Sequence, residues 1–237
     1  MRTTYVDGVR VKVVGTARGD AHHEAGHAVI AVLTGFGVGP RGVRVGGVAG
    51  STGFTDVPAL VVEGDGAHVA HGAPRPPRTP YALARCDALA GVPFVALARR
   101  QIEASFAGPC AEARFDGGRW RGFERMKVTG IRDARDDVHA QDIDKALRTL
   151  LEGSRAIDGT GECERAIERL NQFFWTAEGW GLTRRVATAL YQRKSLTGEE
   201  LEALAGDDDA RAAWDAIGDA LRGPWDAVVP DAAEVSP

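Results

Sequence analysis

Apolar residues recur at helical spacing along most of this chain, and only its first quarter has the patterns of β-structure. Alternating apolar and polar residues over 9–15 predict a strand, and the Val-, Gly- and Thr-rich stretch 42–57 predicts one or two strands with tight turns. Between them, residues 21–35 predict a helix that ends at Gly35 or Gly37. We therefore expect a mainly α fold with a small β-sheet, of the α+β class.

Helical patterns continue through the rest of the chain. In order, they cover residues 81–107 (split near Pro93), 107–118, 136–152, 161–176, 181–194 and 197–205. Residues 118–135 are polar and contain glycine, which predicts a loop. Residues 63–80 include "GAPRPPRTP", which cannot form a regular helix and predicts a loop inserted into the domain.

The chain divides by composition into a domain over residues 1–205 and a tail over residues 206–237. From residue 207 onward there are eight acids against two bases, a net charge of −6. Trp214, Ile217, Leu221 and Trp225 recur at helical spacing, so we expect an amphipathic helix in this acidic tail.

Composition narrows the functional classes. Of the 237 residues, 44% are hydrophobic and 26% charged, as in soluble globular proteins, and the formal charge of −4 argues against general nucleic-acid binding. The chain has no long apolar run, so we expect neither a signal peptide nor a membrane span. Three separated cysteines without a CxxC pair argue against a cysteine zinc site or a disulfide framework, and favour a cytoplasmic setting.

The stretch "AHHEAGHAVI" at residues 21–30 contains the pattern H-E-x-x-H. Residues four apart share one face of a helix, so the imidazoles of His23 and His27 can meet one Zn2+ at about 2.0–2.1 Å. Glu24 lies about 100° round the helix from His23, where it can act as general base for a zinc-activated water. The competing interpretation is a polar cluster that arose by chance at the start of an apolar helix.

A catalytic zinc site needs three protein ligands and one open position, and this motif supplies two ligands. The residues around the motif favour a metal site over a chance pattern. The flanks are apolar and helical, and Gly26 inside a helix costs about 1 kcal/mol relative to alanine, which demands a packing or functional reason. His22 points away from the face that His23 and His27 share, so we do not expect it to bind the metal.

"HEAGHAVIA" at residues 23–31 resembles the peptidase domain of FtsH-type zinc metallopeptidases, whose motif reads HEAGHA followed by apolar residues. Four further segments are similar to that family in its own order: "GSTGFTDV" (50–57), "FAGPCAEARFDG" (106–117), "QDIDKALRTL" (141–150) and "TRRVATALYQRKSLTGEEL" (183–201). The resemblance covers about residues 15–205. It implies a zincin-like HExxH helix within an FtsH-peptidase-like helical bundle.

The resemblance also implies a third zinc ligand. His23 and His27 fall on the two histidine ligands and Glu24 on the catalytic base. Asp142 falls on the aspartate that completes the set, and it is followed by the family's isoleucine and, four residues on, its alanine. Asp136 is the rival, because it too has an alanine four residues later and begins a plausible helix.

Two further roles follow from the resemblance. Gly53, Phe54 and Thr55 correspond to the edge strand that pairs with an extended substrate, with a plain hairpin as the competing interpretation. Glu112 corresponds to a carboxylate at a helix start, which we expect to support a zinc-binding histidine without binding the metal.

These observations predict a zinc metalloendopeptidase that acts on peptides or unfolded proteins, with Zn2+ as cofactor. The chain contains no G-x-x-x-x-G-K-[ST] motif, so we expect no ATPase of its own; a homo-oligomer is compatible with the family's ring assemblies. Two alternatives stay open. One is a catalytically silent, peptidase-like module that binds peptides or a protein partner. The other is a structural zinc site closed by a fourth ligand such as His139 or His22.

Overall fold

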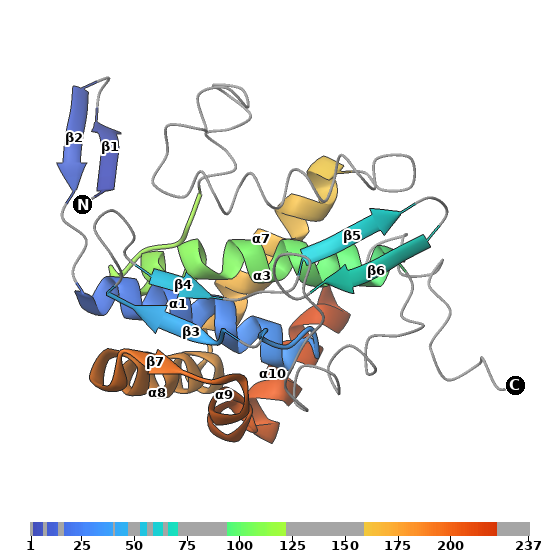
Figure 1. Cartoon of the computed structure of the whole chain (residues 1–237). Helices are drawn as coiled ribbons and strands as arrows, with labels where there is room; N and C mark the ends of the chain where they lie inside the picture. Colours follow the sequence, from blue (N-terminus) through green and yellow to red (C-terminus); the bar gives the residue numbers. More distant parts are fainter. Residues whose placement is uncertain are drawn as a thin grey trace, which may run out of the picture.

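The computed structural model describes residues 2–6, 9–13, 17–39, 41–46, 53–55, 59–63, 66–70, 94–121 and 159–221 (Figure 1). The helices are α1 (Ala17–Leu33), α3 (Phe94–Phe115), α7 (Gly159–Trp175), α8 (Ala177–Arg193), α9 (Gly198–Ala205) and α10 (Asp208–Ala220). The strands are β1 (Arg2–Val6), β2 (Val9–Val13), β3 (Val43–Val45), β4 (Gly53–Thr55), β5 (Ala59–Glu63), β6 (Gly66–Ala70) and β7 (Ser195–Leu196). Helices dominate and the sheets are small and antiparallel, which confirms the mainly α prediction.

Helix α1 is the centre of the packing. It lies against α3 and α8 and is also contacted by β3, β4 and α9 (Figure 1). Every residue from His23 to Leu33 is buried, so the apolar run "AVIAVL" is covered on all sides. A helix that is apolar all round requires such cover in water. None of the helices within the described ranges is both long and apolar enough to cross a membrane.

A three-stranded sheet lies beside α1, in the order β4–β3–β7. Val43 pairs with Thr55 on one side and with Leu196 on the other. The two strands expected within residues 42–57 are therefore confirmed. Among the described strands, β4 is at an edge of this sheet, and β7 joins the sheet from the C-terminal helical region.

The prediction of separate helices that meet near residue 107 is wrong. Helix α3 runs from Phe94 to Phe115 and contains Pro109. Proline cannot donate a helical hydrogen bond, which usually ends or kinks a helix. Here the buried side chains Ile102, Phe106 and Cys110 continue at helical spacing past that point, and α3 packs against both α1 and α7. Tertiary packing therefore outweighs the local effect of the proline.

The predicted loop over residues 63–80 is wrong in part. Residues 66–70 form β6, which pairs with β5 so that Glu63 lies opposite Gly66. A Gly-Asp step separates the two strands, and a two-residue connection of this kind is a hairpin signal. Residues 71–80 lie outside the described residues, as does the predicted helix over 136–152.

The C-terminal helices begin at residues whose side chains cap them. The predicted start of α9 at Thr197 is confirmed: its hydroxyl accepts from the Glu200 amide, and the Glu200 carboxylate accepts from the Thr197 amide. This reciprocal pair satisfies two amides that the helix itself cannot. The helix expected in the acidic tail is α10, whose Trp214 is buried and meets the Phe173 ring edge to face at 5.3 Å. This contact joins α10 to the core.

Candidate metal centre

His23, Glu24 and His27 lie in the middle of α1 and are all buried. Helix α1 is packed against α3 and β4 in this structure. Buried polar side chains need hydrogen-bond partners, and the identity of each partner fixes what the side chain can do. The partners of these three residues come from α1, α3 and β4.

The protonation of His27 follows from its partner on α3. Nδ1 of His27 lies 2.6 Å from the main-chain carbonyl oxygen of Ala104. A carbonyl oxygen only accepts, so Nδ1 carries the proton and donates it. In the neutral ring, Nε2 then holds a lone pair that can bind a cation.

His23 is held in the same way by a side chain of α3. Its Nδ1 lies 3.0 Å from Oε2 of Glu112. An ionised carboxylate also only accepts, so this contact places the His23 proton on Nδ1. The expected support role of Glu112 matches this contact, since a carboxylate behind an imidazole fixes its orientation and tautomer.

The two rings bring their Nε2 atoms to within 3.1 Å of each other. With both protons on Nδ1, neither Nε2 can donate to the other, so two lone pairs face each other in a buried place. Two imidazole lone pairs that converge in this way can be shared by one cation. The pair is therefore suited to hold a metal ion.

Glu24 is held by Thr55 of β4. The Thr55 hydroxyl donates to Oε2 of Glu24 at 2.5 Å and also lies 3.3 Å from the Glu24 carbonyl oxygen. Both side chains are buried. The predicted base is therefore hydrogen-bonded to β4, the strand for which the resemblance implies a role in substrate binding.

Two glycines allow α1 and α3 to approach closely at this site. A Cβ on Gly26 would lie 2.5 Å from the carbonyl oxygen of Ala107, and a Cβ on Gly108 would lie 2.3 Å from Nε2 of His27. The close approach of α3 therefore explains why a glycine stands at position 26 in spite of its cost within a helix. Gly108 leaves room beside the nitrogen that would bind a metal.

The remaining predicted site residues have different outcomes. Asp142, its rival Asp136 and His139 lie outside the described residues. Within the described residues, no group of three or more histidine, cysteine, aspartate or glutamate side chains is arranged to hold a metal ion. Gly53 and Phe54 lie in β4, and their role in substrate binding stays a prediction.

His22 takes no part in the site. Its Nδ1 contacts the Arg18 carbonyl oxygen at 2.7 Å, and its ring stacks on Phe115 and Trp180. Burial is the main reason that its pKa is lowered, although the hydrogen bond to Arg18 acts in the opposite direction. His22 is therefore directed away from His23 and His27, as expected, and is a poor candidate for a fourth zinc ligand.

Three features of the site were not predicted from the sequence. The Ala104 carbonyl is a main-chain group, so no side-chain pattern in the sequence indicates that it would accept a hydrogen bond from His27. The contact from Thr55 to Glu24 joins residues 31 positions apart, on different elements. Gly108 was visible as the start of "GPCAE", but its role depends on how closely α1 and α3 cross.

Comparison of the chain with protein-family models gives no match, and comparison with curated proteins gives no significant match either. Its function is therefore inferred from the site and from the sequence motifs.

Proposed function

We propose that the protein is a zinc-dependent metallopeptidase whose metal is held by His23, His27 and an aspartate, Asp142 in preference to Asp136. One observation carries this proposal. The Nε2 atoms of the two histidines lie 3.1 Å apart while each Nδ1 is engaged by an acceptor on α3. The third ligand rests on the resemblance to FtsH-type peptidases alone.

The two histidines fit zinc by distance and by chemistry. Two nitrogens bound to one zinc ion at about 2.0–2.1 Å, at a tetrahedral angle, lie about 3.3 Å apart. The observed 3.1 Å is close to that separation. Zinc binds the neutral imidazole, which is the form that acceptors on Nδ1 stabilise. Gly108 also leaves room beside Nε2 of His27.

Zinc bound here would act as a Lewis acid, lowering the pKa of a water molecule and polarising the scissile carbonyl. Glu24 then serves as the general base. It takes a proton from the attacking water as the new C–O bond forms, and it gives that proton to the leaving amine as the C–N bond breaks. The Thr55 hydroxyl holds one carboxylate oxygen of Glu24, which fixes the direction of the other.

The substrate proposed is an extended peptide or an unfolded protein. Strand β4 is at a sheet edge among the described strands, and its last residue contacts the base. A peptide that added to this edge as a further strand would run beside Glu24, with main-chain hydrogen bonds supplying affinity without strong sequence preference. Gly53, Phe54 and Thr55 are the residues proposed for this pairing.

The decisive experiment measures zinc content and peptide cleavage on the same samples. Zinc-loaded full-length protein is dialysed, its metal is counted by mass spectrometry, and it is incubated with fluorescently labelled unfolded casein. One zinc per chain and steady cleavage are expected. Glu24→Gln should keep the zinc and lose activity by about 100-fold or more, the usual contribution of a general base.

The other variants separate the alternatives. His27→Ala should lose both zinc and cleavage. Asp142→Asn should weaken zinc binding, whereas Asp136→Asn should not. The opposite result would identify Asp136 as the third zinc ligand. A chain that binds one zinc and cleaves no substrate would refute the peptidase and favour the silent binding module.

A further inference from the structure

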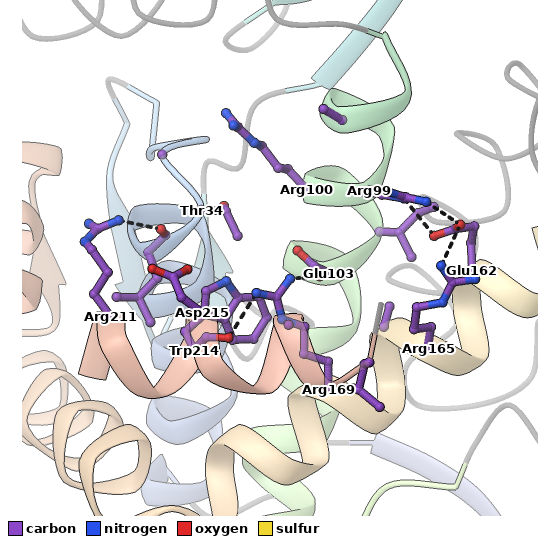
Figure 2. A pocket seen from close by; sticks show the side chains of 17 residues that line it. Thr34, Arg99, Arg100, Glu103, Glu162, Arg165, Arg169, Arg211, Trp214 and Asp215 are labelled. Atoms are coloured by element: carbon purple, nitrogen blue, oxygen red, sulfur yellow. Dashed lines mark hydrogen bonds and ion pairs between the residues drawn. The ribbon is translucent and has the colours of Figure 1, made fainter. Parts of the chain in front are cut away.

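A cavity of about 560 Å3 lies where the C-terminal end of α1 meets α3, α7 and α10 (Figure 2). This volume is within the range of small-molecule binding sites. Its lining is unusually rich in charge: Arg99, Arg100, Arg165, Arg169 and Arg211, against Glu103, Glu162 and Asp215. The described lining residues therefore carry a formal excess of two positive charges, although the whole chain is negative.

Glu162 forms ion pairs with two of these arginines. It accepts from Nε and Nη2 of Arg99 at 3.1 and 3.0 Å, and Nη1 of Arg165 lies 3.3 Å from it. One buried carboxylate therefore faces two guanidinium groups. Nη1 of Arg165 is itself buried, and its contact with Glu162 is an ion pair without the alignment of a hydrogen bond.

Arg169 is held in place from two sides. Its Nη1 donates to Glu103 at 2.9 Å, its Nη2 donates to the Trp214 carbonyl oxygen at 3.0 Å, and its guanidinium lies over the Trp214 ring. Within the described residues, its Nε is buried and has no hydrogen-bond acceptor. The wall of the cavity therefore contains a guanidinium group that is held in place and keeps one donor without a described acceptor.

Arg100 has no hydrogen bond or ion pair within the part of the chain that the structure describes, and no dashed line reaches it in Figure 2. It is half-buried, and burial lowers the pKa of its guanidinium although Glu103 opposes that effect. A cation that is partly removed from water needs a counter-charge. Arg100 therefore presents guanidinium donors that an anionic ligand in the cavity could use.

We propose that this cavity binds a small organic dianion, either a phosphate monoester or a dicarboxylate. Two negative charges match the excess of the lining, and guanidinium groups present paired N–H donors that fit carboxylate and phosphate oxygens. Ile102, Ala166 and Leu221 supply apolar surface for the organic body of the ligand. Arg100 is the residue assigned to the anionic group. This site is separate from the zinc-binding histidines and does not depend on peptidase activity.

Titration calorimetry on the full chain tests the proposal with four aromatic probes of similar size: phenyl phosphate, phthalate, benzoate and benzyl alcohol. At least one dianion should bind at millimolar or lower concentration, benzoate should bind about tenfold more weakly, and the neutral alcohol should not bind. The stronger of the two dianions identifies the headgroup. Failure of both dianions to bind at 10 millimolar, or equal binding of all four probes, would overturn the proposal.

One variant expected to weaken dianion binding and another expected to tighten it together exclude unfolding as the cause of any change in affinity. Arg100→Gln should weaken dianion binding by about tenfold, the effect of losing one charged hydrogen bond. Asp215→Asn, which removes a negative charge from the lining, should tighten it by roughly threefold. Arg121→Gln changes an exposed arginine outside the cavity and should leave binding unchanged. If Arg100→Gln and Arg121→Gln weakened binding equally, the effect would be general charge attraction and the assigned site would be wrong.

Discussion

The hydroxyl of Thr55 donates a hydrogen bond of 2.5 Å to Oε2 of Glu24, and both residues are buried. Thr55 also pairs with Val43 in the sheet, so the strand register determines where its hydroxyl lies. The position of the proposed base is therefore fixed by a helix and by a strand together. Small errors in the placement of a catalytic group can cost large factors in rate.

Thr55→Val should reduce turnover without removing zinc. Valine has nearly the shape of threonine but no hydroxyl, so a buried oxygen of Glu24 loses its hydrogen-bond donor. The Glu24 carboxylate can then rotate away from its position. We expect kcat to fall by about 10- to 100-fold, with zinc content unchanged. Thr55→Ser keeps the hydroxyl and should retain most activity. Equal turnover by Thr55→Val and wild type would show that this hydrogen bond does not position the base.

Gly108→Ala should weaken zinc binding. The added Cβ would lie 2.3 Å from Nε2 of His27, far inside van der Waals contact, so the imidazole must move. We expect zinc affinity to fall at least about tenfold, measured by competition with a chromophoric chelator. In the matched control Gly181→Ala, the new Cβ has only Arg185 Nη1 near it, at 4.0 Å. That control should keep its zinc affinity and gain about 0.5–1 kcal/mol of stability.

Glu112→Gln should lower zinc affinity while the fold is retained. The amide can still accept from His23 but no longer as an anion, which makes the imidazole a weaker ligand. Loss of such a supporting carboxylate typically lowers metal affinity by about 10- to 100-fold. Glu178→Gln, on an exposed position of α8, is the control and should change nothing. An unchanged zinc dissociation constant for Glu112→Gln would show that the 3.0 Å contact does not tune the metal site.

The helices were predictable where local signals and tertiary packing agree. The start of α9 at Thr197 was visible because a capping box is a local pattern. The continuity of α3 through Pro109 was not, because it depends on burial against two other helices. The pairing of β7 with β3 joins strands far apart in the chain, and a two-residue strand carries no periodic signal of its own.

The candidate site, like the fold, was predictable only where local sequence patterns determine its geometry. The closeness of His23 and His27 follows from their spacing of four residues on a helix. Their hydrogen-bond partners depend on how α1 crosses α3, which is set by the absence of a side chain at Gly26. No local pattern encodes the carbonyl of Ala104 as an acceptor. The identity of the third ligand remains a prediction, since Asp142 and Asp136 lie outside the described residues.

A last prediction concerns the acid stability of α10. The Asp207 carboxylate accepts from the Ala210 amide at 2.9 Å and from Arg185, and these hydrogen bonds, the amide first, hold the pKa of Asp207 below its ordinary value of 3.8. The native state therefore binds this proton less readily than the unfolded state. The stabilising contribution is complete above the ordinary pKa and is lost as pH falls through the lowered native pKa.

Asp207→Ala should therefore lose about 1 kcal/mol of unfolding free energy at pH 7, a typical value for a helix cap. Urea unfolding of the variant and the wild type at pH 7, 4.5 and 3 measures this difference, which should shrink at the lowest pH as the wild-type carboxylate becomes protonated. Asp208→Ala is the control, because Asp208 lies in the first turn of α10 but does not cap it. A difference for Asp207→Ala that stayed constant across this range would mean that the charged cap is not its source.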